Sequence, residues 1–165
     1  MEFLNIISYV KIIRPVNLMM IGFTHWIFYH FIIFKLIASS SINSNNLFLL
    51  ILQSICIAAG GYIINDIIDF KADLHNKPHK TYVSQTIPVK LAKYYYFIVV
   101  VCGIVLAGIL QYIIPHFPII LINISLSITL FVYSIRIKNT VLWGNILISL
   151  VVSFVTGIIL IAERY

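Results

Sequence analysis

The chain has 165 residues, of which 61% are hydrophobic and only 10% are charged, and its mean hydropathy is +1.04. This apolar content exceeds what a water-soluble domain of the same size needs, so the composition indicates a polytopic membrane protein. The net charge is +6, but its basic residues follow the membrane topology described below, so they do not indicate a nucleic-acid partner.

The first fifteen residues predict an amphipathic segment that leads to the membrane. It ends at Arg14-Pro15, and proline suits the first turn of a helix because its missing N–H has no partner there. Glu2 and the lack of a basic start argue against a cleavable signal peptide.

Apolar runs of membrane-spanning length, about 20 residues, follow along the chain. The runs are continuous and lack strand-like alternation, so they predict helices and not a β-barrel. We predict an all-α polytopic membrane protein, with one membrane domain over residues 1–165 and a cytoplasmic loop over residues 65–93. The five predicted spans are residues 16–37, 47–64, 94–114, 117–135 and 141–162.

The distribution of basic residues predicts the orientation of these spans. Nine of the eleven Lys and Arg residues fall on one predicted side, and the exceptions are Lys35 and Arg164. The positive-inside rule then places the N-terminus and the 65–93 loop in the cytoplasm, for a protein of the inner or plasma membrane.

The second apolar run ends in the acidic stretch "NDIIDFKAD", which holds three of the five acidic residues of the chain. Asn65, Asp69 and Asp73 are spaced i, i+4, i+8, so on a helix each step drifts by only ~40° and rises by ~6 Å. Their side chains therefore share one helix face, with Asp66 about 100° round the axis.

Neighbouring carboxylates repel each other, and a divalent cation would offset that repulsion. Mg²⁺ commonly takes one or two carboxylates together with substrate phosphate oxygens, and Asn65 adds a neutral oxygen. The basic loop that follows suits a polyanion bridged by metal. A helix end merely in contact with water is the alternative, but the helix dipole favours cations at a C-terminus.

Several stretches together resemble the UbiA-type membrane prenyltransferases. The acidic stretch fits that family's first motif, N-D-x-x-D-x-x-x-D, and its order relative to the other stretches also agrees. The branch that transfers a geranylgeranyl group to geranylgeranylglycerol phosphate is the most similar in the region "INDIIDFKADLHNKP". The other resembling stretches are "RPVN" (14–17), "HNKPHKTYVSQTI" (75–87), "YSIRIK" (133–138) and "WGN" (143–145).

The resemblance implies an Mg²⁺-dependent enzyme that transfers a prenyl group from a polyprenyl diphosphate to an aromatic or glycerol-phosphate acceptor among membrane lipids. It also implies roles for residues at matching positions. Asp69, Asp73 and Tyr133 would be catalytic. The diphosphate would be held by Asn17, Asn65, Lys77, Lys80 and Lys138, and the metal by Asn65, Asp66, Asp69 and Asp73.

The sequence departs from the family pattern in two ways. The loop carries Lys80-Thr81 and Gln85 where the family has Arg-Pro and Gly, and the family's second aspartate motif has no counterpart. We therefore expect the chain to correspond to the N-terminal half of an enzyme and to be inactive alone.

Other functions remain open from the residues themselves. A small cation transporter could use the aspartates, although such acids usually lie near the membrane midplane. A non-catalytic membrane fragment is a further alternative. Two isolated cysteines and two histidines, Cys56, Cys102, His25 and His30, are interpreted as structural residues inside the predicted spans.

Overall fold

The computed structural model is built from helices. It describes residues 2–33, 35, 42–140 and 142–163, without the side chains of residues 2–5, 80, 156 and 163. Within these residues the only strand-like pairing is one bridge between Val83 and Ile87. The helices are α1 (Glu2–Ile12), α2 (Pro15–Phe28), the π-helical turn η1 (Tyr29–Ile33), α4 (Ser44–Asn76), the 3₁₀ turn η2 (Pro78–Lys80), α5 (Val89–Ile113), α6 (Ile119–Ile135), the 3₁₀ turn η3 (Ile137–Asn139) and α7 (Trp143–Glu163).

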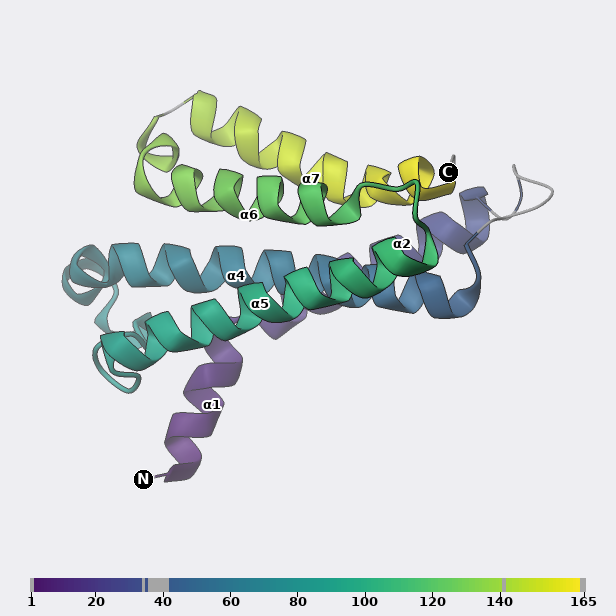
Figure 1. Ribbon diagram of the computed structural model, residues 1–165. Coiled ribbons are helices and arrows are strands. Elements are labelled where there is room, and N and C mark those ends of the chain that lie inside the picture. Colours follow the sequence, from purple (N-terminus) through teal and green to yellow (C-terminus); the bar gives the residue numbers. More distant parts are fainter. Residues whose placement is uncertain (1, 34, 36–41, 141, 164–165) are drawn as a thin grey trace.

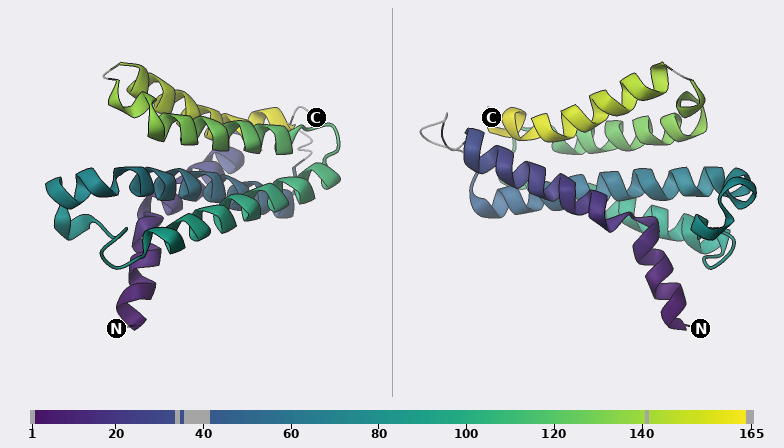
Figure 2. Two further views of the ribbon diagram at one scale, coloured as in Figure 1. Left: turned by 60° about the vertical axis from the view of Figure 1, so that its left-hand side comes forward. Right: turned by 180° about the vertical axis from the view of Figure 1, so that it is seen from behind.

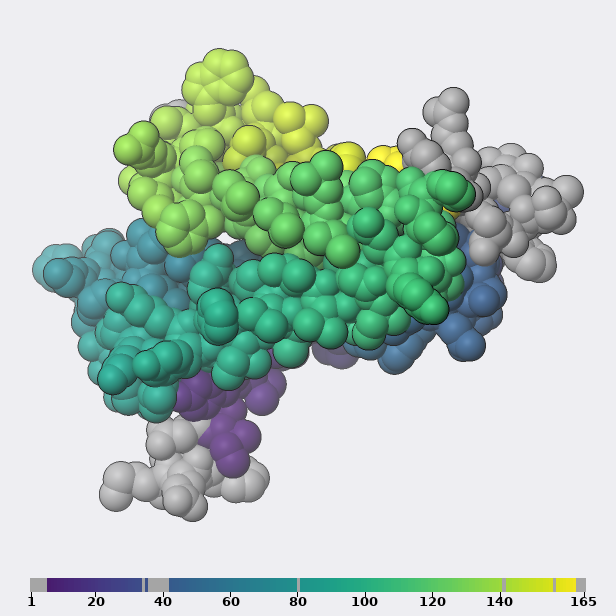
Figure 3. Space-filling view, viewed as in Figure 1, coloured from purple at the N-terminus to yellow at the C-terminus, as the bar shows by residue number. Residues whose placement is uncertain are grey.

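Helix α4 lies at the centre of the bundle, with α5 and α2 on opposite sides of it (Figures 1 and 2). The α6–α7 hairpin forms a second layer that packs on α4 and α5 through α6 and on α2 through α7. Helix α1 turns away from α2 and projects from the bundle (Figure 2). Helices α5 and α6 cover the face seen in Figure 3.

Helix α4 is one continuous helix of 33 residues. The Asn43 side chain caps its start by accepting a hydrogen bond from the backbone N–H of Asn46. No proline interrupts the sequence between Ser44 and Pro78, so the helix can continue to Asn76. The first part of the predicted 65–93 loop is therefore helical, and the acidic stretch lies on a regular helix.

Two adjacent glycines let neighbouring helices approach α4 closely. A Cβ atom on Gly60 would lie 3.4 Å from Val100 of α5, and one on Gly61 would lie 3.0 Å from Leu130 of α6. Small residues at helix contacts are typical of membrane bundles. Gly61 thereby allows α6 to lie close to α4 near its acidic end, which positions the loop that follows α6.

Among the residues that the structure describes, three helices are long and apolar enough to cross a membrane: Pro15–Ile33, Ser44–Asn76 and Val89–Ile113. Helix α6 has 17 residues, and the described apolar part of α7, Trp143–Val155, is also shorter. The prediction of an all-helical membrane bundle is confirmed. Three of the five predicted spans correspond to helices of sufficient length, and the spans assigned to α6 and α7 remain predictions.

Candidate active site

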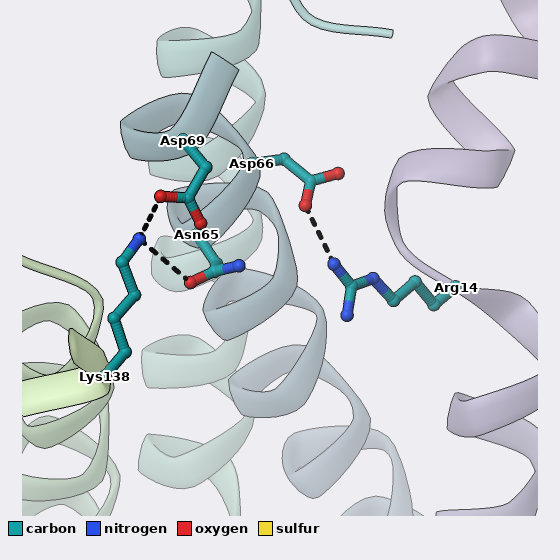
Figure 4. Close-up of polar contacts among 5 residues, drawn as sticks. All are labelled: Arg14, Asn65, Asp66, Asp69 and Lys138. Carbon is teal, nitrogen blue, oxygen red and sulfur yellow. Dashed lines mark hydrogen bonds and ion pairs between the residues drawn. The ribbon is translucent and has the colours of Figure 1, made fainter. Parts of the chain in front are cut away.

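The acidic end of α4 presents two faces to two different partners (Figure 4). Asn65 and Asp69 lie on the side toward η3, and Asp66 lies on the side toward the junction of α1 and α2. This division follows from helical geometry, because positions four apart share a face and adjacent positions diverge by about 100°.

On the first face, Lys138 of η3 reaches both predicted site residues. Its Nζ atom donates to Oδ1 of Asp69 and lies 3.5 Å from Oδ1 of Asn65. The Lys138 side chain is 14% exposed and that of Asp69 is 28% exposed, so the pair is shielded from bulk water. The α6–α7 turn therefore supplies a cation to the acidic face, and the diphosphate-binding role of Lys138 remains a prediction.

On the second face, Arg14 forms an ion pair with Asp66, with Nη2 and Oδ1 2.9 Å apart. Its guanidinium also lies 4.9 Å from the ring centroid of Tyr62. Arg14 has a left-handed backbone, with φ 53° and ψ 66°, a conformation that is costly for a residue with a Cβ. The chain adopts it where α1 ends and α2 begins, and the contacts with α4 hold it there.

An apolar cavity of about 410 Å³ opens beside these polar groups. Residues from α2, α4, α6 and α7 line it, and its polar end includes Arg14, Asn65, Tyr133 and Ser134. Its walls are otherwise mostly aliphatic, including Ile21, Ile57 and Val151. A polar mouth joined to an apolar interior suits a ligand with a charged head and a hydrocarbon tail.

The remaining predicted residues are less closely gathered. Asp73 is half-buried one turn beyond Asp69, and no ion-pair partner for it occurs in the described part of the chain. Asn17 is exposed on the first turn of α2, and its backbone N–H donates to the carbonyl of Arg14. Lys77 is exposed just after α4. Lys80 lies in η2, and its side chain is outside the described residues.

Arg14 was not among the predicted site residues, although it belongs to the "RPVN" stretch. Asp66 is the sequence feature that points to such a residue, because a half-buried aspartate is stabilised in its charged form by a positive charge nearby. Nothing in the local sequence shows which of several basic residues provides that charge.

The donor set fits a metal shared with phosphate better than a self-contained metal site. No three His, Cys, Asp or Glu residues gather closely enough to hold a metal within the described ranges. Oxygen atoms of Asn65 and Asp69 nevertheless converge on one cation, the Lys138 ammonium. Mg²⁺ is commonly bound by one or two carboxylates, with phosphate oxygens and water completing its shell.

The profile of the UbiA prenyltransferase family matches residues 25–162. The chain belongs to the UbiA prenyltransferase family. The resemblance seen in the sequence is thereby confirmed, and with it a multi-pass integral membrane protein.

Curated relatives of this UbiA member are named digeranylgeranylglyceryl phosphate synthase. One from Methanobrevibacter smithii is 29% identical over 95% of this chain and 51% of its own length. One from Methanoculleus marisnigri is 30% identical over 88% of this chain and 48% of its own length. The chain thus spans about half the length of the curated relatives it matches.

A solved structure supports the same fold for this UbiA member. It is described as giving structural and mechanistic insights into the biosynthesis of digeranylgeranylglyceryl phosphate synthase in membranes. The match has a TM-score of 0.79 and 24% identity, and it covers 99% of this chain and 54% of the other. At this identity the likeness concerns the fold.

Proposed function

We propose that this chain forms the part of a prenyltransferase that binds an allylic prenyl diphosphate and Mg²⁺. The reaction is transfer of the prenyl group to a glycerol-phosphate lipid acceptor. The observation that carries the proposal is the junction of an apolar cavity with a mouth that pairs acids with bases. The names of the relatives support a glycerol-phosphate acceptor over an aromatic one.

The ligand would lie with its hydrocarbon tail in the cavity and its diphosphate at the mouth. The cavity volume is within the range of about 300–1,000 Å³ that is usual for small-molecule sites. Lys138 and Arg14 can turn from carboxylates to phosphate oxygens, because both side chains are long and lie at the mouth. Lysine binds phosphate as a point charge, and arginine can bind it through two N–H groups.

Asn65 and Asp69 would hold Mg²⁺, with Asp73 and Asp66 nearby on α4. A bound Mg²⁺ would neutralise charge on the diphosphate.

The chemistry that this arrangement favours is departure of the diphosphate. Breaking the bond between the allylic carbon and oxygen puts negative charge on the diphosphate and positive charge on the prenyl carbon. Lys138 and Arg14 would stabilise the leaving group more strongly as its charge grows. The ring of Tyr133, which lines the polar end of the cavity, would face the carbon cation. Apolar walls exclude water, so the acceptor hydroxyl is the nucleophile that remains. Its oxygen would bond to the prenyl carbon, and its proton would pass to an oxygen of the departed diphosphate.

The proposal includes the membrane arrangement. It has five spans, with α6 and α7 as the fourth and fifth, and it places the N-terminus and the acidic end of α4 in the cytoplasm. The bias of basic residues supports this orientation. The membrane is the inner or plasma membrane.

A photoreactive prenyl diphosphate tests where the ligand binds. The purified chain in lipid nanodiscs is irradiated with an analogue that carries a diazirine at the tail end, and the labelled peptides are mapped. We expect labels on α2, α4 and α7, competed away by geranylgeranyl diphosphate and not by geranylgeraniol. Labels confined to the lipid-exposed face of α5, or labels equally competed by the alcohol, would contradict the proposal.

A further inference from the structure

The cavity has a defined deep end, opposite the polar mouth. Along α4 it runs from Asn65 at the mouth to Ile57, a separation of eight residues that corresponds to ~12 Å at the helical rise. Thr24 of α2 and Val155 of α7 line the cavity far from the mouth. An apolar tail that enters at the mouth can extend until it meets what lies behind these residues.

A buried polar pair lies immediately behind that deep end. His25 has no exposed surface and is adjacent to Thr24 in the chain. Its Nδ1 atom is 2.8 Å from the carbonyl oxygen of Ile21, and its Nε2 atom is 3.3 Å from Oγ of Ser54. The backbone of Val155 on α7 lies close to the ring as well. The imidazole therefore joins α2, α4 and α7.

Each partner of this ring is at or next to the cavity wall. Ile21 and Val155 line the cavity, and Ser54 lies one turn beyond Ile57 on α4. Further along, the same three helices are sealed by a packed core that includes Tyr29, Leu50 and Ile158. The imidazole thus lies between the cavity and this packed core.

We propose that the His25–Ser54 pair is the floor of the cavity and limits the length of the prenyl tail that the site accepts. This inference rests on the proposed function, because it assumes that a prenyl tail occupies the cavity. A longer tail has to displace the imidazole, and its hydrogen bonds to Ile21 and Ser54 resist that movement. Breaking them inside a membrane leaves polar groups without partners, which is costly. His25 is a specificity-determining residue and takes no part in the chemistry.

The test measures binding of geranyl, farnesyl, geranylgeranyl and one longer prenyl diphosphate to the full chain in nanodiscs. For the wild type we expect affinity to rise with tail length and then to stop rising. In His25→Ala the ratio of affinities for the longest and shortest ligands should increase by about tenfold. In His25→Phe, which keeps the bulk without the hydrogen bonds, the ratio should rise by clearly less than in His25→Ala.

A second variant covers the case in which His25→Ala does not fold. Val155→Phe adds bulk at the same deep end, and it should lower affinity for the longest tail by a larger factor than affinity for geranyl diphosphate. The wild type could bind prenyl diphosphates with a dependence on tail length that neither His25→Ala nor Val155→Phe changes. That result would contradict the role of His25 as the cavity floor but would leave the proposed function intact. Absence of binding by any prenyl diphosphate to the wild type would overturn both.

Discussion

At the acidic end of α4, carboxylates are paired with basic residues from other elements: Asp69 with Lys138 and Asp66 with Arg14. These pairs offset the repulsion between acids one turn apart when no metal is bound. They also place two cations where a diphosphate would arrive. Under the proposed function, the two bases would move to phosphate oxygens, and the oxygens of Asn65 and Asp69 would hold Mg²⁺.

Replacing Lys138 with alanine distinguishes its effect on diphosphate binding from its effect on Mg²⁺ binding. In Lys138→Ala we expect affinity for geranylgeranyl diphosphate with Mg²⁺ to fall by about 10- to 100-fold, because a charge-assisted hydrogen bond contributes about 1.5–3 kcal/mol. Binding of Mg²⁺ alone should not weaken, since the competing ammonium is gone. Titration calorimetry measures both quantities. Arg136→Ala, on the same turn but exposed, is the matched control, and an equal loss in that variant would contradict a specific role.

The left-handed backbone at Arg14 should affect the stability of variants at this position. Alanine at this position would lose the contacts with Asp66 and Tyr62 and keep the left-handed strain, whereas glycine would lose the same contacts without the strain. We therefore expect Arg14→Gly to be more stable than Arg14→Ala by about 1 kcal/mol. Thermal unfolding of the two variants side by side measures the difference. Higher stability of the alanine variant would show that Arg14 is not strained.

At the scale of elements, the position of Lys138 depends on the tight join between η3 and α7. A Cβ atom on Gly144 would lie 3.0 Å from the carbonyl oxygen of Ile137 and 3.3 Å from Cα of Lys138. Both atoms belong to the backbone, so they cannot move without moving η3. The residue that the site needs is thus placed by a glycine on the next helix.

Gly144→Ala should shift η3 and lower affinity for the prenyl diphosphate several-fold, although alanine favours a helix by about 1 kcal/mol over glycine. Gly157→Ala on the same helix is the control, because a Cβ there meets no described atom within 4 Å. The control should bind normally and unfold at the same or a higher temperature. Equal affinity in the two alanine variants would mean that the turn does not position Lys138.

At the scale of elements, some features of the structure could be predicted from the sequence and others could not. The shared face of Asn65 and Asp69 was predictable because helical spacing is local, and so was the α6–α7 turn near it through the resemblance. A helix was predicted for the acidic stretch as far as Asp73, but its last residues to Asn76 were not, because the polar sequence after Asp73 was read as a loop. The ion pair of Arg14 was not predicted, since it joins residues 52 positions apart and depends on how α1 meets α2.

At the scale of the whole molecule, the site forms where two layers meet. The α4–α5 layer with α2 carries the acids and Arg14, and the α6–α7 hairpin carries Lys138, Tyr133 and one cavity wall (Figure 1). Hydropathy predicted the helices of both layers but not the cavity between them, because lipid-facing and cavity-facing aliphatic side chains are alike in sequence. The proposed function of the assembled mouth and cavity is to hold a prenyl diphosphate through Mg²⁺.

The most direct test of that claim is the affinity of the chain for geranylgeranyl diphosphate in nanodiscs, with Mg²⁺ and with the metal chelated. We predict Mg²⁺-dependent binding that Asp69→Asn weakens by at least tenfold. Glu2→Gln, which removes the same charge far along the sequence from the acidic stretch, should bind as the wild type does. Binding that is equally strong without Mg²⁺, or unchanged in Asp69→Asn, would contradict the account.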